Sequence, residues 1–114
     1  MKNPKIAALF AVLAFGGCMY PKAAEPPAVL TAAELETVRA KYPDIAGATV
    51  TAGRDLFVAH CNECHDHPDI LAIEDGEWPE IIEEMGHEAK LDKAQSDSVL
   101  KFVQAVRAAR AKAK

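Results

Sequence analysis

The sequence lacks the features of several common protein classes. It contains no internal repeat, which excludes a solenoid. Its longest apolar run, IAALFAVLAF at residues 6–15, is too short for a membrane-spanning helix, which needs about 20 residues. No stretch alternates between apolar and polar residues as a strand does, so the expected fold class is all-α. Cysteine is scarce, with three in 114 residues.

Basic residues are also in short supply over much of the chain. The net charge is −4, and removal of Lys2 and Lys5 with a leader would leave 11 basic against 17 acidic residues, or −6. Residues 63–92 hold eleven carboxylates and one lysine, whereas residues 93–114 hold six basic residues and one acid. This balance makes nucleic acid an unsuitable partner and favours a basic protein partner for the acidic region.

The N-terminal region has the pattern of an export signal. A basic start, the short apolar run and small residues before Cys18 predict a signal peptide over residues 1–17. The stretch FGGC resembles the lipobox of bacterial lipoproteins, in which the new N-terminal cysteine carries lipid. Cys18 is therefore the expected lipidation site, with ordinary signal cleavage nearby as the alternative. Residues 18–30, rich in Pro and Ala, are expected to form a flexible tether that reaches about 40 Å at full extension.

Four helices are expected in residues 31–114, which form the predicted domain. The first begins with a capping box of Thr31 and Glu34 and stops before Pro43. The second is expected to follow a turn at DIAGA, with Thr51 as its cap, and to run into Cys61. The third carries apolar residues at helical spacing from Trp78 and ends at Gly86. The fourth extends from Asp92 to about Arg110.

The stretch HCNECH at residues 60–65 combines two cysteines and a following histidine. A disulfide between Cys61 and Cys64 would close a very small loop and stabilise little. A thioredoxin-like dithiol belongs in a βαβ unit, and strands are missing from the pattern. A zinc site would need further ligands, and the histidines match no common finger spacing. Those histidines are His60, His65, His67 and His87.

The remaining interpretation uses all three residues of the motif. C-x-x-C-H is the attachment signature of c-type haem, in which two thiols add across the haem vinyl groups as thioethers. The histidine, here His65, then binds the iron as the proximal ligand. Because haem is attached outside the cytoplasm, the predicted export signal makes this match more specific. Cys61 and Cys64 would form the thioethers, which leaves Cys18 for lipid.

The chain also resembles the class I cytochrome c family over residues 49–110. That family places a glycine eight residues and an aromatic four residues before the first haem cysteine, and Gly53 and Phe57 occupy those positions. The resemblance implies that the helix crosses the C-terminal helix at Gly53 and that Phe102 packs there. It further implies a cytochrome c fold of four to five short helices around one covalently attached haem c.

A sixth ligand to the iron is expected from residues after the motif. His60 and His67 adjoin the attachment segment on the proximal side, whereas Met85 continues the apolar stripe that begins at Trp78. Met85 is thus the predicted axial ligand opposite His65, with His87 or an open site as alternatives. The stretch WPEIIEEM is similar to short cytochrome c domains in which Trp precedes the axial Met by seven residues. That resemblance implies that Trp78 packs against the haem edge with its N–H near a propionate.

These observations predict a monohaem c-type cytochrome that carries single electrons between redox proteins. It is expected in the bacterial periplasm, anchored to a membrane through lipid, and is not expected to be an enzyme. Methionine opposite histidine raises the haem potential, and nearby carboxylates lower it. The alternatives are a haem-based gas sensor with a labile sixth ligand and a fixed haem subunit of a larger redox complex.

Overall fold

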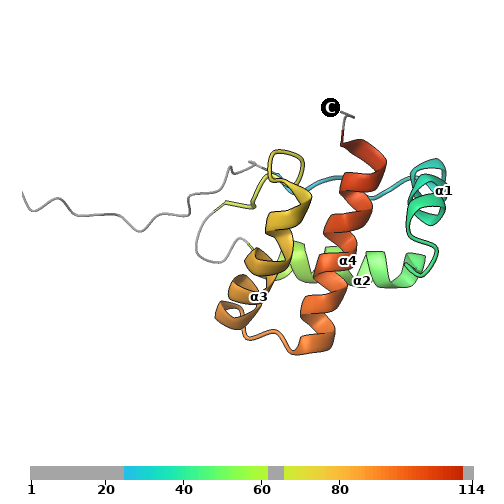
Figure 1. Ribbon diagram of the computed structural model, residues 1–114. Helices are drawn as coiled ribbons and strands as arrows, with labels where there is room; N and C mark the ends of the chain where they lie inside the picture. Colours follow the sequence, from blue (N-terminus) through green and yellow to red (C-terminus); the bar gives the residue numbers. More distant parts are fainter. Residues whose placement is uncertain (1–24, 62–65, 112–114) are drawn as a thin grey trace, which may run out of the picture.

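The computed structural model describes residues 25–61 and 66–111, which form a helical domain with no β-strand in those ranges (Figure 1). The all-α prediction is confirmed for this part of the chain. The elements are α1 (Ala32–Lys41), α2 (Gly47–His60), a short 3-10 helix η1 (Asp75–Glu77), α3 (Trp78–Glu88) and α4 (Lys93–Arg110). Helix α4 is central, because α1, α2 and α3 all pack against it.

Helices α1 and α4 begin as the sequence predicts. The Thr31 hydroxyl accepts from the Glu34 N–H at 3.2 Å, and the Glu34 carboxylate accepts from the Thr31 N–H at 2.8 Å. Asp92 and Gln95 form the same reciprocal arrangement at the start of α4. Each capping box satisfies N–H groups that have no partner inside the helix, which fixes where the helix starts.

Helix α2 begins earlier than predicted. Thr51 is not its cap but lies in the second turn, where its hydroxyl donates to the Gly47 carbonyl at 3.2 Å. The chain enters the helix from Ala46, which is extended and offers no side-chain cap. The predicted DIAGA turn is therefore wrong for its last two residues. Burial explains the extra turn, since Val50 adds a buried position one turn before Gly53.

Helix α3 ends later than predicted, because Gly86 does not terminate it. Gly86 is a buried helical residue, and the helix continues to Glu88. The left-handed position after the helix is occupied by Lys90, with φ of 58°. The Leu91 N–H donates to the Gly86 carbonyl at 2.9 Å and the Lys90 N–H to the His87 carbonyl at 3.1 Å, which is a Schellman ending.

The core lies where α2 and α3 pack against α4. Among the predicted apolar stripes, the α4 positions and the first three α3 positions are buried, and Met85 is half-buried against them. The largest fully buried side chains are Trp78, Phe57, Phe102, Ile73, Val38, Val99, Val103 and Val106. Among the described helices, none has the length and hydrophobicity to cross a bilayer.

Residues 27–30, assigned to the tether from sequence, lie against the helical domain. Leu30 is buried in the core, and backbone carbonyls of the preceding residues accept hydrogen bonds from Arg54 and Arg110. These four residues therefore pack with the helical domain. The predicted signal peptide and Cys18 lie outside the described residues.

Candidate functional site

The crossing of α2 and α4 positions the C-terminal end of α2. At Gly53 the helices approach so closely that an added Cβ would lie 2.0 Å from the Ser98 carbonyl oxygen and 2.8 Å from the Phe102 Cβ. Only glycine fits there, because the obstruction is α4 backbone and not a movable side-chain tip. The predicted crossing at Gly53 with Phe102 beside it is confirmed as a local geometry.

Three rings form a buried cluster one turn further along α2. The Phe57 ring is tilted at 59° to that of Phe102, with centroids 5.5 Å apart. The Phe57 ring also stacks on the His67 imidazole, with centroids 5.2 Å apart and an interplanar angle of 17°. Phe57 and Phe102 are fully buried, and His67 is 5 % exposed. Phe57 therefore connects the helix crossing to the loop that follows residues 62–65.

Cys61 directly follows this cluster as the cap residue of α2. Its N–H donates to the Phe57 carbonyl at 3.0 Å, so its backbone is fixed by the last turn of the helix. Its side chain is half-buried and packs against the hydrophobic core. Cys64 and His65, the other two residues of the motif, lie outside the described residues.

Met85 reaches the same hydrophobic core from α3. It is half-buried and packs against the cluster that Cys61 also contacts. The structure thus brings these two predicted site residues to one apolar core from elements that are separate in the sequence. His87, the alternative ligand, is exposed and lines an open groove of about 750 Å³ between α3 and α4. Burial consequently favours Met85 over His87 as a ligand to a group held in the core.

Trp78 carries an indole N–H that needs an acceptor. The residue is 1 % exposed, and its Nε1 has no hydrogen-bond partner among the described residues. A buried donor without an acceptor costs roughly 1–3 kcal/mol, so such groups usually have a partner in the functional state. An acidic group of a cofactor bound in the core would supply one. This unpaired donor is compatible with the haem propionate that the resemblance implies.

Arg107 fixes the loop between His67 and α3, and sequence reasoning did not identify it. Its Nη1 donates to the carbonyls of Ile70 and Leu71 at 2.9 and 3.2 Å, and its Nε is paired with Asp75. The side chain is only 10 % exposed. Basic residues are common in the last turns of helices, where they interact favourably with the helix dipole. The local sequence therefore does not distinguish Arg107 from other such residues.

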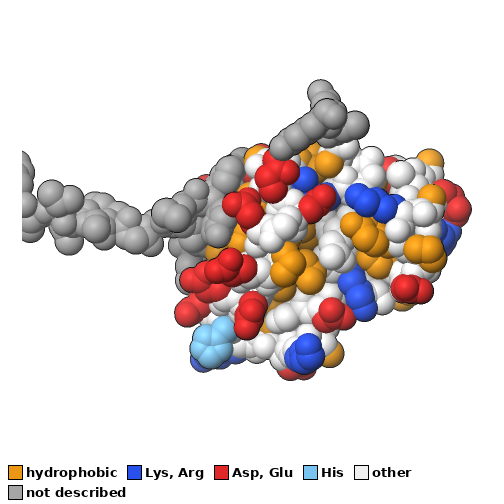
Figure 2. Space-filling view, in the orientation of Figure 1, with side chains coloured by type: hydrophobic (Ala, Val, Ile, Leu, Met, Phe, Trp, Pro, Cys, Tyr) orange, Lys and Arg blue, Asp and Glu red, His pale blue; other side chains and the backbone are white. Residues whose placement is uncertain are grey.

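The surface near the candidate site is acidic. Figure 2 shows acidic side chains gathered over α3 and the segment before it. The exposed carboxylates of this region are Glu74, Asp75, Glu77, Glu80, Glu83, Glu84 and Glu88. In residues 25–61 and 66–111, no three His, Cys, Asp or Glu side chains are grouped to hold a metal ion.

His67 is the second residue whose role the sequence did not indicate. The sequence indicates it only as a possible metal ligand, and the structure places it as a buried ring against Phe57. The loop around it has no periodicity from which burial could have been predicted.

Comparison with protein-family profiles, with characterised proteins and with solved structures finds no match to this chain. Function must therefore be argued from the residues and their arrangement.

Proposed function

We propose that this protein is a monohaem c-type cytochrome that carries single electrons between redox proteins. The observation that carries the proposal is the position of Cys61. The C-x-x-C-H motif begins at the last turn of a helix that crosses α4 at Gly53, with Phe57 and Phe102 packed at the crossing. This is the arrangement that the resemblance to class I cytochromes implies.

The residues that would hold the haem come from two sides of the core. Cys61 and Cys64 would hold it through thioethers, His65 would be the proximal ligand and Met85 the distal ligand. Met85 already packs against the core, so it needs little rearrangement to reach a group bound there. The haem would supply one-electron chemistry through its iron. The chain supplies the attachment, the axial ligands and a dry surrounding.

The buried side chains of α2, α3 and α4 would exclude water from the bound group. Phe57, Trp78 and Ile81 are at most 2 % exposed. Exclusion of water favours the lower net charge on iron and so raises the potential, whereas the acidic surface over α3 lowers it. With His65 and Met85 both holding the iron, no coordination position would be left for oxygen or peroxide, so the protein would be a carrier and not an enzyme that activates them.

The proposed carrier acts outside the cytoplasm, at the surface of a bacterial membrane. Support comes from the sequence, which has an export pattern, a lipobox-like FGGC stretch and a Pro-rich segment after Cys18. Its partners are redox proteins, and the acidic surface favours those with a basic docking face.

The absorption spectrum of the exported protein tests the ligand set. We expect a low-spin c-type spectrum in both oxidation states and a weak long-wavelength band of sulfur ligation in the oxidised form. Met85→Ala should abolish that band, while His87→Ala, the matched control on the same helix, should retain it. The assignment of Met85 as the sulfur ligand fails if Met85→Ala retains the band and His87→Ala abolishes it.

Carbon monoxide separates the carrier from the gas-sensor alternative. The reduced carrier should bind carbon monoxide slowly or not at all, because Met85 occupies the distal position. Met85→Ala should bind it rapidly and completely. Rapid and complete binding by the wild-type protein at neutral pH would contradict the carrier and support the sensor.

A further inference from the structure

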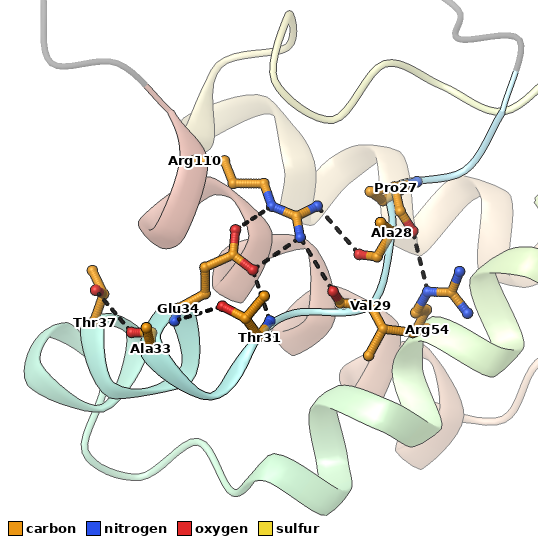
Figure 3. Close-up of polar contacts among 9 residues, drawn as sticks. All are labelled: Pro27, Ala28, Val29, Thr31, Ala33, Glu34, Thr37, Arg54 and Arg110. Carbon is orange, nitrogen blue, oxygen red and sulfur yellow. Dashed lines mark hydrogen bonds and ion pairs between the residues drawn. The ribbon is translucent and has the colours of Figure 1, made fainter.

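Residues 27–30, which we name the strap, are held on the domain by two arginines (Figure 3). Arg54 Nε donates to the Pro27 carbonyl at 3.1 Å. Arg110 donates to the Ala28 and Val29 carbonyls at 3.2 and 3.4 Å. Leu30 follows and is 8 % exposed. Three successive carbonyls are thus bound by side chains from α2 and α4, and the next residue enters the core.

Arg110 is itself held in place by α1. Its Nε and Nη2 donate to the two carboxylate oxygens of Glu34 at 2.6 and 3.0 Å, a bidentate pair. Glu34 also accepts the Thr31 N–H, as Figure 3 shows. One guanidinium group therefore connects α4, the start of α1 and the strap, and its planar shape fixes all three contacts together.

The sequence of the strap favours docking. Pro27, together with Pro26 just before the strap, restricts the backbone to extended conformations, which lowers the entropy lost when the segment binds. Because Arg54 and Arg110 bind the backbone carbonyls of residues 27–29, these contacts depend on the path of the chain and not on the side chains of Pro27, Ala28 and Val29. Ala28 and Val29 are correspondingly exposed.

The N-terminal end of the strap lies beside the loop that follows the haem motif. Glu25 and Pro27 share a cavity of about 140 Å³ with residues 68–71 and with Arg110. Figure 1 shows the segment before α1 passing next to this loop. Pro68 follows His67, whose ring stacks on Phe57, and the Phe57 carbonyl binds the Cys61 N–H. The described chain therefore begins, at Glu25, beside the loop that follows the haem motif in the sequence.

Docking of the strap also shortens the free tether. A chain free from Cys18 to residue 30 would reach about 40 Å, whereas one held from residue 27 reaches about 30 Å. The shorter chain joins the proposed anchor to the face formed by residues 68–71.

We propose that the strap turns the haem end of the domain toward the membrane that carries Cys18, so that its electron partner is a redox protein in or on that same membrane. This inference rests on the proposed function. A freely rotating tether would instead present the haem equally to soluble partners.

The strap itself is tested by the distance between two spin labels in the full exported chain. One label is at Ala28→Cys, beside Arg110 at the C-terminal end of α4, and the other is at Lys93→Cys, at the N-terminal end of α4. We expect a narrow distance distribution that broadens severalfold in Arg54→Gln/Arg110→Gln. Arg39→Gln, which removes an exposed pair with Glu36, should leave it narrow. Arg54→Gln alone, which leaves the Glu34 pair intact, guards against loss of folding and should broaden it partly. A broad distance distribution in the parent chain would show that the strap is not held on the domain and would overturn the proposal.

Orientation is tested on phosphatidylcholine vesicles containing a small fraction of nickel-chelating lipid. A single spin label at Leu71→Cys should relax at least severalfold faster than one at Lys93→Cys, and the double arginine variant should remove the difference. Equal relaxation at both positions in the parent chain, or no vesicle binding, overturns the proposal. Labels found by mass spectrometry on Cys61 or Cys64 would instead contradict the proposed function, so the two failures are distinguishable.

Discussion

Gly53 has the tightest backbone approach of the described glycines, and its replacement tests the helix crossing. Gly53→Ala would place a methyl group 2.0 Å from the Ser98 carbonyl oxygen, so α2 and α4 must separate. We expect a loss of roughly 3 kcal/mol in the free energy of unfolding, measured by urea denaturation.

Gly86→Ala is the matched control for this prediction. There the added Cβ meets only the Ser96 side chain, with the hydroxyl oxygen at 2.4 Å and the Cβ at an ordinary contact distance of 3.4 Å. The hydroxyl can rotate away, and helix propensity gains about 1 kcal/mol. The free energy of unfolding should therefore change by less than about 1 kcal/mol. Equal losses in both variants would contradict the special role of the crossing.

Glu34 gives the protein a defined sensitivity to acid. Its hydrogen bonds with Arg110 and the Thr31 N–H lower the pKa of the carboxyl group from 4.5 to about 2. Because the folded pKa is the lower one, the stabilisation is complete above pH 4.5 and is lost as pH falls toward 2. Glu34→Gln should lower the melting temperature at pH 7, and the difference from wild type should vanish near pH 2. A difference that stays constant over this range would contradict the ion pair.

At the scale of elements, the end of α3 offers a stabilising change. Lys90 occupies the left-handed position with φ of 58°, which costs a non-glycine residue about 1 kcal/mol. Lys90→Gly should therefore raise the free energy of unfolding by about 1 kcal/mol, measured by urea denaturation. Lys93→Gly, in the first turn of α4, should lower it instead.

Elements were predictable from the sequence where a local pattern defines them. The capping boxes at Thr31 and Asp92 and the apolar spacing in α3 and α4 lie within a few residues of each other, so they can be recognised directly. The start of α2 has no side-chain cap, and the left-handed position after α3 is occupied by Lys90 and not by glycine. Both boundaries were consequently misplaced.

For the candidate site, the sequence indicates Cys61 from a motif and Met85 from a helical stripe, and both stay predictions. Gly53 is indicated by a family resemblance, and its close approach to α4 is confirmed. Arg107 and Arg110 act through contacts between residues far apart in the chain, such as Arg110 with Glu34, 76 positions away. His67 stacks on Phe57 from a loop without periodicity. Such pairs leave no periodicity or spacing that a single sequence can reveal.

At the scale of the whole molecule, the uneven charge predicts how the rate of electron transfer to charged reagents depends on ionic strength. The exposed carboxylates over α3 should attract cationic reagents to the proposed haem region. Reduced protein should therefore react faster with a cationic ruthenium ammine complex as ionic strength falls, and slower with ferricyanide. Glu83→Gln/Glu84→Gln should weaken both trends, whereas Glu36→Gln on α1 should not. Rates independent of salt would contradict this use of the acidic surface.

Covalent attachment of haem can be measured directly as the mass of the denatured, exported protein. We predict a chain heavier by one haem, with Cys61 and Cys64 both resistant to alkylation and the colour retained after acid–acetone extraction. A colourless chain of unmodified mass, with both of these thiols open to alkylation, would contradict the proposed cytochrome.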